Sequence, residues 1–254
     1  MGQVPEANPW LLVGDGRLAL HLHTYLRQLD VAHRRWSRAR GWHDARRPTT
    51  GLSAALPRFE RILLAISDDA LEPFVAAHDA RRSLPWVHFS GGRRVVGAWA
   101  AHPLCTFAGQ PYPEAIYREI PFIVEAEGPP LSEILPGLPN PSAAIPAADR
   151  ALYHALCVAA GNFTTLLWRD FFARLEDRWG IDSALARPYL RRTLANLEGA
   201  DLAGALTGPI ARGDAGTIRR NLAALDEGGL DGLARVYRAF VAASPTPRGA
   251  ETAA

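Results

Sequence analysis

The feature that most constrains the fold is a short apolar run that stops at two closely spaced glycines and passes directly into a helical pattern. Residues 10–19 read Trp-Leu-Leu-Val-Gly-Asp-Gly-Arg-Leu-Ala. Gly14 allows a tight turn, Gly16 lets backbone approach a bound group, and Ala19 lets the helix pack closely on the strand. Helix N-terminal amides at such a turn favour a dinucleotide pyrophosphate. The predicted contacts are Gly14, Asp15, Gly16, Arg17 and Leu18.

The segments that follow alternate between strand and helix patterns. Leu18, Leu22, Leu26 and Leu29 lie roughly on one helix face, and residues 31–36 are a second strand. Further strands are expected at 62–66, 86–89, 96–100 and 121–125, with Ser67-Asp68-Asp69 as the cap signal of a helix through 70–80. This alternation predicts an α/β Rossmann-like parallel sheet with right-handed crossovers.

A change of composition suggests two domains. Six prolines fall between Gly128 and Ala148, a stretch that supports neither a long helix nor a central strand. From Asp149 the pattern stays helical to about Val241. We therefore expect a nucleotide-binding Rossmann-like domain over 1–127, a junction over 128–148, an all-α helical substrate and dimerisation domain over 149–246, and a flexible tail over 247–254.

Charge and composition exclude several functions. All 28 basic residues are arginine, so neither a lysine Schiff base nor a lysine proton donor is available. The net charge is only +2 and the arginines are scattered, which argues against nucleic acid and favours a small-molecule partner. Cys105 and Cys157 lack metal-ligand spacing and are expected to be reduced thiols. No secretion signal or apolar span is evident, so we expect a soluble cytoplasmic protein.

The end of the second strand indicates which cofactor is bound. NAD sites carry an acidic residue about 20 positions after the glycines, whereas residues 33–38 read His-Arg-Arg-Trp-Ser-Arg. Ser37 and Arg38 suit a 2′-phosphate, so NADP (NADPH) is the predicted cofactor, and the alternative is a solvated basic loop. Ser67, Asp68 and Ser90 follow strands at the same sheet edge and are expected near the cofactor, although helix capping alone explains Ser67 equally well.

Residues for chemistry are predicted in the helical part. His154 and Asn162 lie eight residues apart on one helix, so His154 is a candidate general acid and Asn162 a candidate for orienting substrate or nicotinamide. The alternative for His154 is a core residue. Thr207 and Arg212 lie in a glycine- and proline-containing loop and are expected to bind a substrate carboxylate. Arg212 could instead pair with Asp214.

Six stretches in the expected order resemble a family of oxidoreductases with a Rossmann-like N-terminal domain and a helical C-terminal domain of the 6-phosphogluconate dehydrogenase type. They are residues 14–19, 63–70, 87–91, 102–107, 149–155 and 206–214, the last reading Leu-Thr-Gly-Pro-Ile-Ala-Arg-Gly-Asp. The superfamily includes ketopantoate reductases, pyrroline-carboxylate reductases and prephenate dehydrogenases. The resemblance implies hydride transfer, and it implies that His102 and Ser90 lie near the nicotinamide. The alternative for His102, which precedes a proline, is a structural hydrogen-bonding residue.

The sequence departs from the family at three places. Asp15 puts a carboxylate near the expected pyrophosphate, the stretch from Glu125 to Asp149 is short, and the lysine of β-hydroxyacid dehydrogenases is missing. We therefore expect a homodimeric NADP-dependent reductase acting on a ketone or imine carbon of a small carboxylate, with a ketopantoate-like 2-oxo acid as leading substrate. His154, helped by His102, would supply the proton. The alternative is a non-catalytic dinucleotide-binding regulatory or interaction protein.

Overall fold

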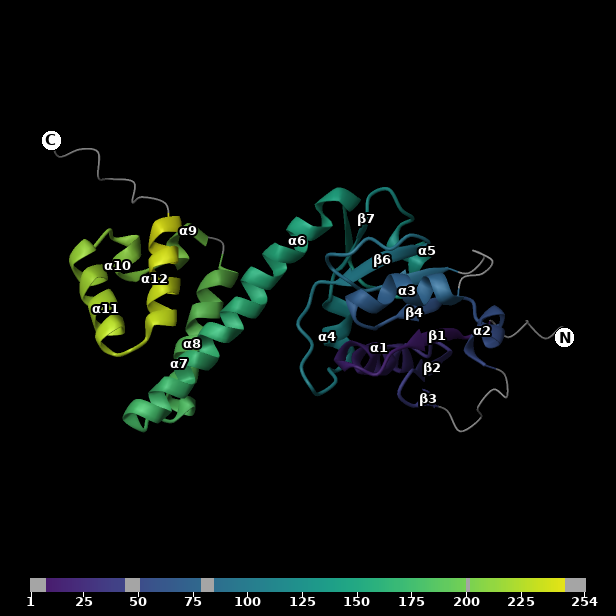
Figure 1. The fold of residues 1–254 in the computed structure, drawn as a ribbon, viewed down its shortest axis with the longest axis horizontal. Coiled ribbons are helices and arrows are strands. Elements are labelled where there is room, and N and C mark those ends of the chain that lie inside the picture. The colour runs from purple at the N-terminus through teal and green to yellow at the C-terminus, as the bar shows by residue number, and fades with distance from the viewer. Residues whose placement is uncertain (1–7, 44–50, 79–84, 200–201, 245–254) are drawn as a thin grey trace. The chain divides into compact units, whose positions relative to one another are not determined.

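A computed structural model describes residues 8–43, 51–78, 85–199 and 202–244 (Figure 1). The chain divides into two compact units between Leu166 and Leu167. The first unit contains a sheet of eight strands in the order β3-β2-β1-β4-β5-β6-β7-β8. Its strands are β1 (Trp10–Val13), β2 (His33–Ser37), β3 (Gly41–Trp42), β4 (Ile62–Leu64), β5 (Trp86–His88), β6 (Ala98–Pro103), β7 (Phe122–Glu125) and β8 (Ser142–Ile145).

Helices connect these strands along the chain. They are α1 (Arg17–Gln28), α2 (Leu52–Ala55), α3 (Asp68–His78), α4 (Glu114–Glu119) and α5 (Leu131–Ile134), with 3₁₀ turns at Leu56–Arg58 and Ala147–Asp149. Strands β2, β1, β4, β5 and β6 run parallel to one another. The predicted Rossmann-like fold class is confirmed, because this mostly parallel sheet is followed by a helical region.

Two pairings differ from the predicted all-parallel sheet. Strand β3 turns back antiparallel onto β2, and β7 runs antiparallel to β6. The segment between β6 and β7 contains Pro111 and Pro113 and only the six-residue helix α4, so it lacks the long helix of a parallel crossover. Neither β3 nor α4 was predicted, since β3 has only two residues and α4 only six.

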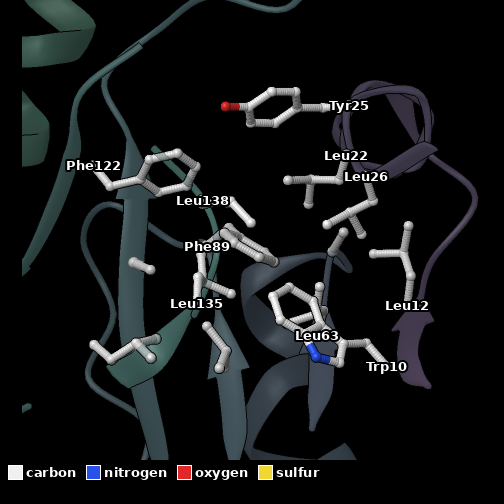
Figure 2. Packing of buried hydrophobic residues seen from close by; sticks show 14 of the residues in the cluster. Trp10, Leu12, Leu22, Tyr25, Leu26, Leu63, Phe89, Phe122, Leu135 and Leu138 are labelled. Atoms are coloured by element: carbon white, nitrogen blue, oxygen red, sulfur yellow. The ribbon is translucent and has the colours of Figure 1, made fainter. Parts of the chain in front are cut away.

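The core lies on both faces of the sheet. In β1 the side chains of Trp10 and Leu12 pack on one face, whereas those of Leu11 and Val13 pack on the other, as the twofold period of a strand requires. Figure 2 shows α1 residues Leu22 and Leu26 near the strand residues Leu12 and Leu63. Burial on both faces explains why these strands are continuously apolar.

The proline-rich stretch contributes to this core. Leu131, Ile134, Leu135 and Leu138 are buried in the cluster that contains Trp10 and Leu12. The short helix α5 and the edge strand β8 lie within the stretch, and β8 pairs parallel with β7. Residues 128–148 thus pack on the sheet, and their elements are as short as the proline content leads one to expect.

The helices after the sheet begin with α6 (Arg150–Cys157), which continues through a π-helical turn (Val158–Phe163) into α7 (Thr164–Trp179). They continue as α8 (Ser183–Glu198), α9 (Leu202–Ala205), α10 (Gly208–Ala211), α11 (Ala215–Glu227) and α12 (Asp231–Ala243). Within the second unit, the ring centroids of Trp168 and Tyr189 lie 5.4 Å apart. Among the residues described, no helix is both long enough and apolar enough to cross a membrane.

Candidate functional site

The glycine turn after β1 is shaped by its neighbours in the sheet. Gly14 has φ +142°, and a Cβ there would lie 2.2 Å from the Ala65 carbonyl oxygen. Its amide donates to the Trp36 carbonyl over 2.9 Å. Gly16 immediately precedes α1, and a Cβ there would meet no other atom within 4 Å. Gly14 is therefore required by strand packing, whereas Gly16 leaves space in front of the helix N-terminus.

The side chain of Asp15 turns toward the segment that follows β2. Its carboxylate lies 3.0 Å from Arg40 Nε and 3.7 Å from an Arg35 nitrogen. Arg17, next in the turn, is exposed, and Leu18 packs partly against the core. The carboxylate expected to repel a pyrophosphate thus has two cationic neighbours.

The β2–β3 turn uses Ser37 as a structural residue. The hydroxyl of Ser37 is buried, lies 2.9 Å from His43 Nε2, and accepts a hydrogen bond from the Arg40 amide over 3.3 Å. Arg38 is exposed in the same turn. Ser37 therefore fixes the turn that presents Arg38.

A pocket of about 370 Å³ lies across the ends of β1, β2 and β4. It is lined by the glycine turn and by three aromatic rings; its residues include Gly14, Asp15, Trp36, Ser37, Arg38, Ser67, Phe74 and His78. The Trp36 and Phe74 ring centroids lie 6.0 Å apart, and those of Phe74 and His78 lie 4.5 Å apart. From β1 the strand order continues through β2 on one side and through β4 on the other, so the order of the strands switches direction between β1 and β4. Open α/β sheets bind ligands at such a switch point.

The predicted cofactor residues Asp68 and Ser90 contact each other. The Ser90 hydroxyl donates to Asp68 Oδ2 over 2.8 Å and accepts from the Arg93 amide over 3.1 Å. Ser90 is buried, and Arg93 also pairs with Asp69. These bonds fix the glycine-containing turn after β5 against the start of α3.

This turn brings the two predicted catalytic histidines together. A Cβ on Gly91 would lie 2.5 Å from His154 Cδ2 and 3.0 Å from His102 Nε2. The two imidazole centroids are 5.8 Å apart with their planes at 81°. His102 lies in β6 and His154 in α6, so only the fold places them side by side.

A second pocket, of about 360 Å³, contains both histidines. Its lining includes His102, Cys105, Thr106, His154, Cys157 and Asn162. Cys105 and Cys157 are free thiols, as predicted. Within the described part of the chain, no three His, Cys, Asp or Glu side chains are placed to hold a metal ion.

The π-helical turn places Asn162 in this pocket together with His154. Eight residues of α-helix make about 2.2 turns, which would rotate Asn162 by about 80° from His154. A π-helical turn has hydrogen bonds between residues five apart, and each residue rotates the chain less about the helix axis than in an α-helix. The π-helical turn therefore reduces this offset. The sequence alone gave no sign of this turn, because its residues form helix in either geometry.

Burial decides the charge of His102. Desolvation, the neighbouring His154 and the Arg150 guanidinium lower the pKa of His102 to about 4. His102 is consequently neutral near pH 7 and cannot deliver a proton as an imidazolium. Its Nδ1 forms a 2.8 Å hydrogen bond with the hydroxyl of Tyr153, a residue that sequence reasoning missed. Tyr153 directly precedes His154 in the chain, and this adjacency was the only sequence feature that could have indicated a role for it.

Arg150 is a second residue that the sequence analysis overlooked. Its side chain is 1% exposed and donates to the Arg93 carbonyl over 3.1 Å and to the Ser90 carbonyl. The nearest carboxylate oxygen is that of buried Glu125, 3.8 Å from Arg150 Nε. A cation in the first helical turn opposes the helix dipole, and this unfavourable position was the available signal.

His88 lies near this cluster and is fully buried. Burial, followed by the charge of Arg150, lowers the pKa of His88 to about 4. Neither ring nitrogen has a hydrogen-bond partner among the described residues. His88 is thus a neutral core histidine for which the sequence pattern predicts no role.

Thr207 and Arg212 belong to the second unit. Thr207 precedes α10 without a side-chain capping bond, and Arg212 is exposed at its end. Asp214 instead caps α11, accepting from the Thr217 amide over 2.9 Å and its hydroxyl over 2.7 Å. Hydrogen bonds to Thr217 lower the pKa of Asp214. The fold within this unit does not place the pair relative to His102 and His154.

Comparison with known proteins supports the fold assignment. Residues 120–244 match a domain of unknown function, DUF2520. No curated protein matches the sequence. A candidate NADP oxidoreductase from Bacteroides fragilis is 23% identical, covering 93% of this chain and 97% of its own, with a TM-score of 0.74.

Two more distant structures share the fold. An imine reductase from Streptomyces aurantiacus is 14% identical, covering 94% of this chain and 96% of its own, with a TM-score of 0.63. A reductive aminase from Aspergillus terreus, in complex with NADPH and ethyl levulinate, is also 14% identical, covering 93% and 94%, with a TM-score of 0.59. At these identities the similarity establishes a shared fold that spans nearly the whole chain.

Proposed function

We propose that this protein is an NADP(H)-dependent oxidoreductase that transfers a hydride between the nicotinamide and a ketone or imine carbon of a small molecule. The observation that carries the proposal is the pocket across β1, β2 and β4, lined by the glycine turn together with Ser37 and Arg38. Structures of the same fold described as an NADP oxidoreductase and as an NADPH complex support this choice of cofactor.

The residues of this pocket fit the cofactor chemically. The turn at Gly14–Gly16 and the first amides of α1 would hold the pyrophosphate, since a Cβ at Gly16 would enter open space. Arg38 would bind the 2′-phosphate, and Trp36 and Phe74 would contact the adenine. Asp15 is compatible with this arrangement because Arg40 and Arg35 offset its charge.

The pocket that contains His102 and His154 would hold the substrate. When bound, NADPH supplies the hydride. His154 would give the proton that completes reduction, and Asn162 would orient the reacting group, since both line the pocket. A ketopantoate-like 2-oxo acid remains the proposed substrate, with Thr207 and Arg212 as the proposed carboxylate ligands.

We also propose that a second copy of the chain covers the helical unit. Ala234 is the only described residue beyond Leu166 that is fully buried, whereas Leu185, Tyr189 and Leu202 are more than 60% exposed. Helices with so little enclosed core need a partner to bury their apolar side chains. Sedimentation of the purified protein should give twice the mass of one chain, and a monomer at micromolar concentration would contradict this.

The cofactor proposal predicts selective stabilisation by the phosphorylated nicotinamides. NADPH or NADP at a hundredfold excess over its Kd should stabilise the protein by about 2.7 kcal/mol, whereas equal concentrations of NADH or NAD should act less. In Gly16→Asp the new carboxylate should abolish the shift by repelling the pyrophosphate. The variant itself should fold, because the position has space and aspartate is a favoured N-cap.

Arginine variants separate specific recognition from general charge. Arg38→Gln should weaken NADPH binding about tenfold or more and leave NADH binding nearly unchanged, because only the 2′-phosphate loses a charged partner. The matched control is Arg27→Gln, which removes an exposed arginine on α1. If no nicotinamide cofactor shifts the melting temperature, the oxidoreductase proposal fails.

Activity distinguishes an enzyme from a cofactor-binding regulator. We expect NADPH oxidation with a 2-oxo acid or imine, and a loss of about a hundredfold or more in kcat for His154→Gln. The variant should still show the cofactor-induced thermal shift, since His154 lines the other pocket. A selective thermal shift without turnover on any such substrate would favour the non-catalytic regulatory protein.

A further inference from the structure

The hydrogen bond between His102 and Tyr153 joins two elements that are distant in sequence. Tyr153 lies on α6 and His102 lies near the end of β6. The hydroxyl and Nδ1 are 2.8 Å apart, and the rings meet edge to face with centroids 5.5 Å apart. The hydrogen bond therefore engages one ring nitrogen, and the edge-to-face contact orients the plane of the His102 ring.

Either partner of this bond can be the donor, because a neutral tyrosine hydroxyl both donates and accepts hydrogen bonds. A neutral imidazole carries one donor and one acceptor nitrogen. Burial, together with His154 and Arg150, keeps His102 neutral near pH 7. Burial and the nearby Cys157 raise the pKa of Tyr153, so its hydroxyl keeps its proton. The Tyr153 hydroxyl can then donate to Nδ1, which leaves the imidazole hydrogen on Nε2.

The Nε2 edge of the His102 ring lies beside a glycine, Gly91. A side chain at Gly91 would bring its Cβ to 3.0 Å from Nε2. Nε2 has no hydrogen-bond partner among the described residues, although His102 lines the same pocket as Thr106 and Asn162. Within the described residues, no hydrogen bond therefore competes with a ligand for Nε2.

We propose that Tyr153 is a positioning residue that holds neutral His102 as its Nε2–H tautomer, so that His102 donates a hydrogen bond to the carbonyl oxygen or imine nitrogen of the substrate. The substrate role rests on the proposed function, whereas the tautomer is a property of the free protein. His102 then polarises the reacting bond, and His154 retains the role of proton donor. This division replaces the expectation that His102 helps to supply the proton.

Nitrogen NMR of the histidine rings tests the tautomer without cofactor or substrate. Protein grown with labelled histidine should show His102, assigned by comparison with His102→Gln, with a protonated Nε2 and an unprotonated Nδ1 near neutral pH. In Tyr153→Phe the Nδ1 signal should shift as the tautomers mix. The matched control is Tyr25→Phe, which removes a hydroxyl bonded to Asn140 elsewhere and should leave His102 unchanged.

Two results would overturn the proposal. A protonated Nδ1 in the unaltered protein would reverse the hydrogen bond, and this result is decisive even if Tyr153→Phe does not fold. An unchanged His102 spectrum in folded Tyr153→Phe would show that the hydroxyl does not set the tautomer. Neither result bears on cofactor binding, which the thermal shift reports separately.

The kinetic consequence is a selective loss in kcat. Tyr153→Phe removes the hydrogen bond that favours the Nε2–H tautomer of His102. The kcat should therefore fall by about three- to tenfold. The KM for NADPH should be unchanged, because Tyr153 does not line the cofactor pocket. An equal rise in the KM for NADPH would instead indicate a general structural defect.

Discussion

Gly14→Ala is expected to destabilise the protein by about 3–5 kcal/mol. The backbone φ of +142° is one that L side chains rarely adopt, and the new Cβ would lie 2.2 Å from the Ala65 carbonyl oxygen. Neither problem can be relieved by rotating a side chain. The Gly14 amide and the Ala65 amide both take part in the pairing around β1, so a shift there would disturb β2 and β4 together. Urea unfolding followed by circular dichroism measures the loss.

The matched control is Gly16→Ala, two residues further along. Position 16 has an ordinary negative φ and open space, so the cost there should be no more than about 1 kcal/mol, mainly from the poor N-cap. Equal losses of unfolding free energy in the two variants would contradict the argument that position 14 requires glycine. The contrast matters because sequence motifs treat both glycines as cofactor residues.

Arg150→Met should destabilise the protein by about 3–5 kcal/mol, because it leaves the buried Glu125 carboxylate without its cation. The carbonyls of Ser90 and Arg93 lose their donor at the same time. These carbonyls belong to the turn that contacts His102 and His154 through Gly91, so catalysis should fall as well. Denaturant unfolding and kcat are the two measurements.

A second substitution separates the charge from the hydrogen bonds. Adding Glu125→Gln to Arg150→Met should restore part of the stability, because a neutral amide costs less to bury than an unpaired carboxylate. Arg118→Met, which removes an exposed ion pair with Glu114, should cost less than about 1 kcal/mol. If Arg150→Met lowers the free energy of unfolding as little as Arg118→Met does, the buried contacts of Arg150 do not hold α6 to the sheet.

How far the sequence predicts the fold depends on how local each signal is. The β1–α1 turn was predictable because an apolar strand, two glycines and a helical pattern are adjacent in the chain. Strands β4 and β5 were predictable for the same reason, since strands buried on both faces are continuously apolar. Strand β3 was missed because its two residues, Gly41 and Trp42, are too few to show the alternating pattern of a strand.

The candidate site depends more on long-range contacts. Its residue types were readable, and His102 and His154 were singled out, but their placement around Gly91 required β5, β6 and α6 to meet. Asp15 illustrates the same limit, because only the folded turn after β2 supplies Arg40 as its partner. Tyr153 likewise acquires a role only once β6 brings His102 to it.

By itself, the sequence determined the longer strand and helix segments, the apolar core strands and the chemical types available, since these follow from neighbouring residues. Only the tertiary structure decided the antiparallel β7, the burial of Arg150 and the bond between Tyr153 and His102. The physical reason is that burial and hydrogen-bond partners come from segments far apart in the chain, so desolvation and pairing energies are set only when those segments pack.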